Sequence, residues 1–108
     1  MSVDALKPLR CPRCGGPSDV PTWLDHARTK VLEHGAVAVD CPRCRADLHL
    51  EVRKGHAALG SLSETAPRMF RPEVRLEQSG LETSGDPDTM RVAWQRREWW
   101  FQRRDRAG

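Results

Sequence analysis

The tetrapeptide CPRC occurs twice in this chain, at residues 11–14 and 41–44, and the two copies contain all four of its cysteines. Two cysteines separated by two residues can both reach one metal ion, because the turn between them brings their sulfur atoms to the same side. Two such turns supply the four tetrahedral thiolates that structural zinc sites use. The spacing therefore predicts one Zn²⁺ per chain, bound by Cys11, Cys14, Cys41 and Cys44.

The residues around the cysteines favour the same turn, which we call a knuckle. Pro12 and Pro42 preset the backbone φ angle early in each turn, and Gly15 follows the first pair, where a positive φ angle is needed. Over residues 10–54 the chain resembles the zinc-ribbon class, with knuckles of the kind that rubredoxins also use. The resemblance implies a scaffold and no particular activity. The chain departs from the class in its long gap between knuckles and in Arg45, where many second knuckles carry glycine.

Other uses of the cysteines fit less well. Iron is an alternative, since rubredoxin sites use the same four ligands, but the order of metal affinities favours zinc. A thioredoxin-like redox role requires one CxxC motif in a βαβ setting, and this chain has two motifs without that pattern. With four thiolates available, we expect solvated surface side chains at all four histidines, which are His26, His34, His49 and His56.

The sequence also bears on the compartment and on the size of the core. The opening MSVDALKPLR has no apolar run that predicts a signal peptide, and no later stretch predicts a membrane span. We therefore expect a cytoplasmic protein, where reducing conditions favour metal ligands over disulfides.

The mean hydropathy of −0.67 predicts a modest core, which a bound metal would help to stabilise.

The stretch between the knuckles has a helical pattern of apolar residues. Thr22 with Asp25 resembles a capping box, and Gly35 is placed as a C-cap. These features predict a helix over about residues 22–34, inserted between the knuckles. Its apolar face would hold Trp23, Leu24, Ala27, Val31 and Leu32.

Strand patterns flank the second knuckle. Residues 36–39 and 46–53 alternate in hydrophobicity, which predicts a hairpin whose turn is the second CPRC. Residues 71–78, RPEVRLEQ, also alternate, and their proline suits an edge strand. Residues 57–62 are compatible with either a turn or a short strand.

The C-terminal part has a different character. Residues 78–88 are acidic and rich in turn formers, which predicts a linker. Asp86 followed by Pro87 is typical of a helix start, so we expect a helix over residues 89–108. No single helix orientation buries all of its tryptophans, and a strand with Met90, Val92 and Trp94 on one face and QRRE as a turn is the alternative.

Together these elements predict a small α+β fold, a zinc-ribbon β-hairpin with an inserted helix and a basic, aromatic C-terminal helix. Its expected division is a zinc-ribbon domain with an edge strand over residues 1–77, the linker over 78–88 and the helix over 89–108.

The charge is concentrated at the C-terminal end. Residues 1–89 contain 12 Lys/Arg and 13 Asp/Glu, whereas residues 90–108 contain six arginines and two acidic residues. Arginine pairs with phosphates and tryptophan stacks on bases. We therefore expect an accessory protein that binds nucleic acid, or a nucleoprotein machine such as a ribosome or RNA polymerase. The expected contacts are Arg96, Arg97, Trp99, Trp100, Arg103 and Arg104.

Two alternatives use the same tail differently. Tryptophan and arginine are enriched at binding hot spots, so the tail could dock a protein partner, which would make the chain an interaction adaptor or a small structural subunit. The tail could also pack on the body as part of the core. An enzyme is not expected, because the sequence contains no catalytic constellation and a four-cysteine zinc has no open coordination position. The sequence does not define the oligomeric state.

Overall fold

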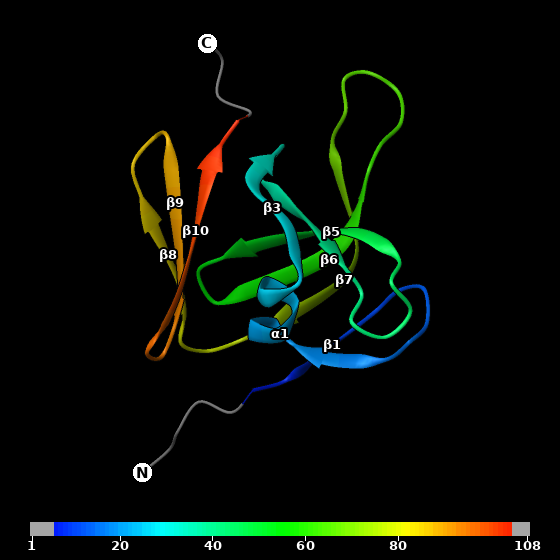
Figure 1. The fold of residues 1–108 in the computed structure, drawn as a ribbon, viewed down its shortest axis with the longest axis horizontal. Helices are drawn as coiled ribbons and strands as arrows, with labels where there is room; N and C mark the ends of the chain where they lie inside the picture. Colours follow the sequence, from blue (N-terminus) through cyan, green and yellow to red (C-terminus); the bar gives the residue numbers. More distant parts are fainter. Residues whose placement is uncertain (1–5, 105–108) are drawn as a thin grey trace.

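The structure, a computed structural model, describes residues 6–104, which form ten strands and one short helix (Figure 1). Five strands form an antiparallel meander: β3 (Ala27–Glu33), β4 (Ala36–Asp40), β5 (Asp47–Arg53), β6 (His56–Leu62) and β7 (Phe70–Glu77). Three more form a second meander: β8 (Leu81–Gly85), β9 (Thr89–Trp94) and β10 (Arg97–Arg103). A parallel pairing of β10 with β3 joins them into one sheet of order β7-β6-β5-β4-β3-β10-β9-β8.

The remaining elements precede this sheet in the chain. Strands β1 (Pro8–Arg10) and β2 (Pro17–Asp19) form a separate two-stranded sheet, followed by helix α1 (Val20–Asp25). Trp23 and Leu24 of α1 are fully buried in a core shared with strands of both meanders. The indole Nε1 of Trp23 donates a hydrogen bond of 2.8 Å to the carbonyl oxygen of Leu9, which attaches α1 to β1.

The large sheet curls, so its β8 end returns to the turn between β5 and β6. The amide of Gly55 in that turn donates to the carbonyl of Leu81 at 2.9 Å, and the amide of Gln78 donates to the carbonyl of Gly55 at 2.8 Å. Leu81 is fully buried. The stretch 78–88, expected to be a linker, therefore contains a strand that contributes to the core.

The predicted α+β fold is wrong, and the first reason is the stretch after the first knuckle. The helix there covers only Val20–Asp25. Asp19 caps its start by accepting a 2.9 Å hydrogen bond from the amide of Thr22, and His26 is the cap at its end. The chain then continues as strand β3. The predicted C-cap is instead a two-residue hairpin turn, since His34 and Gly35 both have positive φ angles (54° and 80°).

The C-terminal helix is the second error, over residues 89–104, since residues 105–108 lie outside the described part of the chain. The strand alternative is confirmed, with a turn shorter than the predicted QRRE. Strands β9 and β10 form a hairpin whose turn is Gln95–Arg96, and Met90, Val92 and Trp94 are all buried. Along β10, Trp99 and Phe101 point into the core, while Trp100 between them is 52% exposed. A period of two, which a helix does not have, explains this alternation.

Asp86 does not start a helix, although its hydrogen bonds are those of a helix cap. Its side chain accepts from the amides of Asp88 and Thr89, at 2.9 and 2.7 Å. Here the same hydrogen bonds close the turn between β8 and β9. Asx-type turns and helix N-caps share this local geometry, so the residue types alone do not distinguish them.

Other predicted elements are confirmed. Strands β4 and β5 form the expected hairpin, in which Asp40 pairs with Asp47 and the second CPRC is the turn. Strand β7 is an edge strand, as RPEVRLEQ predicted, and residues 57–62 belong to β6. Within residues 6–104, no helix has the length and apolar character needed to cross a membrane.

The alternation along β10 predicts very different costs for neighbouring substitutions. Phe101→Ala should lower the free energy of unfolding by about 3–5 kcal/mol, because it leaves a cavity in the core. Trp100→Ala should lower it by less than about 1 kcal/mol, since much of that side chain already contacts water. Urea unfolding of the metal-loaded proteins measures both. Equal costs for the two variants would contradict this strand register.

Candidate metal centre

The two knuckles are the same loop, built twice at the tips of two hairpins. The first connects β1 to β2 and the second connects β4 to β5. The amide of Cys11 donates to the carbonyl of Gly16 at 3.0 Å, and the amide of Cys41 donates to that of Ala46 at the same distance. Each hairpin therefore closes immediately outside its CPRC, which presents both cysteines of a pair on one side.

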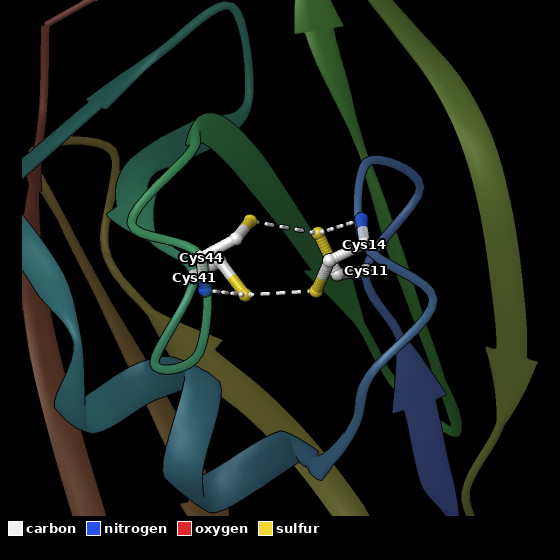
Figure 2. A group of neighbouring side chains, drawn as sticks. All are labelled: Cys11, Cys14, Cys41 and Cys44. Atoms are coloured by element: carbon white, nitrogen blue, oxygen red, sulfur yellow. Dashed lines mark hydrogen bonds between the residues drawn. The ribbon is translucent and has the colours of Figure 1, made fainter.

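The four sulfur atoms meet between the two loops, and Figure 2 shows them pointing toward one another. The Sγ atoms of Cys11 and Cys44 are 3.8 Å apart, as are those of Cys14 and Cys41, and all four lie within 4.8 Å of one another. These are not disulfides, whose sulfurs are about 2.05 Å apart. A tetrahedral zinc–sulfur bond length of about 2.3 Å places neighbouring sulfurs about 3.8 Å apart. The cluster therefore has the dimensions needed to hold a metal ion.

Backbone amides stabilise negative charge on the buried sulfur of each knuckle. The amides of Arg13 and Cys14 point at Cys11 Sγ, at 3.3 and 3.5 Å. The amides of Arg43 and Cys44 point at Cys41 Sγ, at 3.3 and 3.4 Å. Hydrogen bonds of this kind favour the thiolate, which is the form that binds metal.

The thiol pKa values show why a cation suits the cluster. Burial raises the pKa of Cys41, but the amides of Cys44 and Arg43 outweigh it and lower that pKa to about 7. For Cys44, the amide of Ala46 lowers the pKa, but burial and the neighbouring thiols raise it to about 12. Close sulfurs cannot all ionise unless a positive charge compensates them, and a divalent cation supplies that charge.

Three arginines near the cluster form hydrogen bonds with backbone carbonyls or with a carboxylate of the protein. Arg10 Nη1 donates to the carbonyl of Gly15 at 3.0 Å, and Arg43 Nε donates to that of Pro17 at 3.2 Å. Arg13 forms two hydrogen bonds with Glu73 on β7, at 2.8 and 3.1 Å, which hold the pKa of that carboxyl below its usual value. Arg10 and Arg43 would offset the net charge of −2 that four thiolates and a divalent ion would carry, whereas the charge of Arg13 is balanced by Glu73.

Arg45 differs from the other arginines in its backbone. It has a φ angle of 65°, and it occupies in the second knuckle the position of Gly15, whose φ angle is 75°, in the first. Side chains other than glycine are strained in this left-handed region, by about 1–2 kcal/mol. The second knuckle therefore stores strain that the first avoids.

The four histidines lie outside the sulfur cluster, as expected. His26, His34 and His56 are exposed. His49 was also expected to be solvated, but it is half-buried on β5, and burial, followed by the charge of Arg28, lowers its pKa. A lowered pKa favours the neutral imidazole, although the ring takes no part in the cluster.

Two of the six expected partner contacts are used inside the molecule. Arg97 forms an ion pair of 2.7 Å with Asp25 of α1, and its guanidinium lies 4.7 Å from the ring centroid of Trp99. Trp99 is 6% exposed and donates its indole hydrogen to Asp25 at 3.0 Å. Burial raises the pKa of Asp25, but these hydrogen bonds outweigh it and lower that pKa. The sequence showed no sign of this link, since Asp25 and Arg97 are 72 positions apart.

The other four expected contacts are accessible but do not form one compact patch. Arg96 is exposed in the β9–β10 turn, and Trp100 is exposed midway along β10. Arg103 donates to the carbonyl of Asp86 at 3.2 Å, and Arg104 lies 3.8 Å from a carboxylate oxygen of Glu33. At about 3.3 Å per residue, Arg96 and Arg104 lie roughly 25 Å apart, with Trp100 between them.

No protein-family model, curated protein or solved structure matches this chain. Inference about its function therefore rests on its own residues. Among residues 6–104, the four-cysteine cluster is the one group of at least three His, Cys, Asp or Glu side chains with the spacing of a metal site.

Cys41→Ser should damage the centre far more than His49→Ala. The serine removes a buried ligand that no neighbouring group replaces, so the metal should be lost and the melting temperature should fall by more than about 10 °C, on the order of a few kcal/mol. The histidine change should leave the metal content unchanged. Metal analysis and thermal melts measure both effects, and a variant Cys41→Ser that retains one metal ion per chain would contradict the ligand assignment.

The two knuckles provide a matched pair of substitutions for the strain at Arg45. Arg45→Gly should raise the free energy of unfolding by about 0.5–1 kcal/mol, since it relieves the left-handed strain. Gly15→Arg should lower it by a similar amount or more, although no atom lies within 4 Å of a Cβ built there. Denaturant unfolding with metal bound measures both changes. A lower free energy of unfolding for Arg45→Gly would contradict this prediction, because it would mean that the contacts of the Arg45 side chain stabilise the fold by more than its left-handed backbone destabilises it.

Proposed function

We propose that this protein is a non-catalytic binding protein with one structural Zn²⁺, which presents a face of its sheet to single-stranded nucleic acid. The observation that carries the metal assignment is the 3.8 Å spacing of sulfurs from the two knuckles. Zinc fits four thiolates in a tetrahedron, and the order of metal affinities favours it over iron.

The structural role follows from the ligand set. Four protein thiolates fill a tetrahedral shell, so neither water nor a substrate has a coordination position. Cys11 and Cys41, one from each knuckle, are almost completely buried. The ion would cross-link the small sheet to the β4–β5 hairpin of the large one, which supports a role in stability.

The binding face that we propose is the outward side of the second meander, centred on Trp100. This side chain is 52% exposed. Arg91 lies directly opposite it on β9 and forms an ion pair of 2.6 Å with Glu98, so the exposed cations are near the ends of the strand. Arg96 is exposed beyond one end of the strand and Arg104 beyond the other, whereas Arg103 lies on the side of β10 that carries Trp99 and Phe101. An exposed aromatic side chain on a sheet, with cations along the strand, is suited to stack a base while phosphates pair with arginine.

The charge of this part of the chain favours nucleic acid over a protein partner. Six arginines and two acidic residues occupy positions 90–108, whereas the rest of the chain is nearly neutral. An exposed tryptophan also suits a protein hot spot, so an adaptor role is the second candidate. The salt dependence of binding distinguishes the two candidate functions. Phosphate contacts weaken steeply as the salt concentration rises, and an aromatic contact with a protein weakens less.

The test is the binding of a single-stranded oligonucleotide of about 15 nucleotides, measured by fluorescence anisotropy. Trp100→Ala should weaken binding about 5- to 100-fold, the effect expected when one base no longer stacks on an aromatic ring. Replacing Arg96 and Arg104 by Gln should lower the salt slope by about 1 for each phosphate that is no longer paired with a cation.

The control is Arg71→Gln, which removes an exposed arginine from the edge strand β7, and it should bind the oligonucleotide like the unaltered protein. Zinc content and melting temperature establish that each variant is folded. A protein that does not bind at low salt, or a Trp100→Ala variant that binds as tightly, would rule out this face and leave the adaptor.

A further inference from the structure

A groove runs over the solvent side of strands β5, β6 and β7, away from the sulfur cluster. It has a volume of about 520 Å³, within the range of small-molecule sites. The β3–β4 turn and the loop between β6 and β7, which projects from the body in Figure 1, form two of its walls. Its lining includes three arginines and two histidines, namely Arg53, Arg68, Arg75, His34 and His56.

The floor is hollow because the middle of β6 carries two small residues on this side, Ala58 and Gly60, between His56 and Leu62. Ala58 pairs with Glu51 of β5 and with Arg75 of β7, so a methyl group lies between two long side chains. Gly60 follows on the same side, where β7 bulges toward β6. A Cβ at Gly60 would overlap the backbone of Arg71, so only glycine fits there.

The charges in the groove leave an excess of positive charge. Arg53 pairs with Glu51 at 3.3 Å, and Glu51 is the acidic side chain of the lining. Within residues 6–104, neither Arg68 nor Arg75 forms an ion pair. Arg68 donates its Nε to the carbonyl of Ser63 at 3.1 Å, which leaves its terminal nitrogens for another acceptor.

The loop that carries Arg68 is ordered by its own hydrogen bonds. The amide of Ser63 donates to the carbonyl of Met69 at 2.8 Å, and the amide of Met69 donates to Ser63 Oγ at 2.9 Å. Met69 is 60% exposed and lines the groove together with Phe70 and Pro72. One wall is therefore apolar and lies beside two guanidinium groups that have no carboxylate partner among the described residues.

We propose that this groove binds a small phosphate-bearing molecule with a flat apolar ring, of the size and chemistry of a mononucleotide. Arg68 and Arg75 hold the phosphate, because guanidinium groups match its oxygens with paired hydrogen bonds. The ring lies against Met69 and Phe70. The site is separate from the Trp100 face and does not depend on the function proposed above.

The experiment is a titration of the full-length, zinc-loaded, ¹⁵N-labelled protein with adenosine 5′-monophosphate, followed by NMR. Amide shifts should concentrate in residues 51–58 and 68–75. Replacing Arg68 and Arg75 by Gln should weaken binding at least about tenfold. Ala58→Leu, which fills the floor without a change in charge, should weaken it as well. Replacing Arg96 and Arg104 by Gln, a matched control on the Trp100 face, should have no effect.

Three further titrations identify the chemistry that is recognised. Adenosine and inorganic phosphate should each bind at least about tenfold more weakly than the mononucleotide, since each makes only one of the two contacts. A single-stranded oligonucleotide should shift amides around Trp100 and leave the groove unchanged. The proposal is overturned if millimolar mononucleotide leaves the groove amides unshifted, if the double variant binds equally well, if adenosine or phosphate binds as tightly, or if only the oligonucleotide shifts the groove.

Discussion

The structure depends on four sulfur atoms that come together from two separate hairpins. One pair belongs to the loop after β1 and the other to the loop after β4, two segments that are far apart along the chain. Despite burial, backbone amides lower the pKa of Cys41, whereas, despite the amide of Ala46, burial and the neighbouring thiols raise the pKa of Cys44, so the four sulfurs do not all ionise without a compensating cation. A divalent ion bound by all four thiolates would cross-link the two sheets.

Other contacts of the same segment depend on that cross-link. Strand β1 has only three residues, and besides β2 it is held by the Trp23 hydrogen bond to Leu9 and by the Arg13–Glu73 pair, which ties the adjoining knuckle to β7. Helix α1 in turn attaches to β10 through Asp25. A metal bound at the knuckles would thus hold the N-terminal hairpin in place, and the core and these polar contacts link that hairpin to the C-terminal strands.

Local patterns predicted the parts of the molecule that local interactions determine. Cysteine spacing identified the four candidate ligands, and alternation identified the β4–β5 hairpin and the β7 edge. The helix over residues 22–34 was wrong beyond Asp25, because β3 forms there between β4 and β10, and β10 is a partner distant in sequence. The pairing of Asp25 with Arg97 and Trp99 is equally distant. Spacing and periodicity carry no information on such contacts.

The central claim is that four thiolates bind one zinc ion, and X-ray absorption at the zinc edge, on protein purified under reducing conditions, tests it most directly. The account predicts one zinc per chain, with four sulfur neighbours at about 2.3 Å and no nitrogen or oxygen bound to the metal. A protein without bound metal, or a zinc ion coordinated by histidine nitrogen or water oxygen, would contradict it.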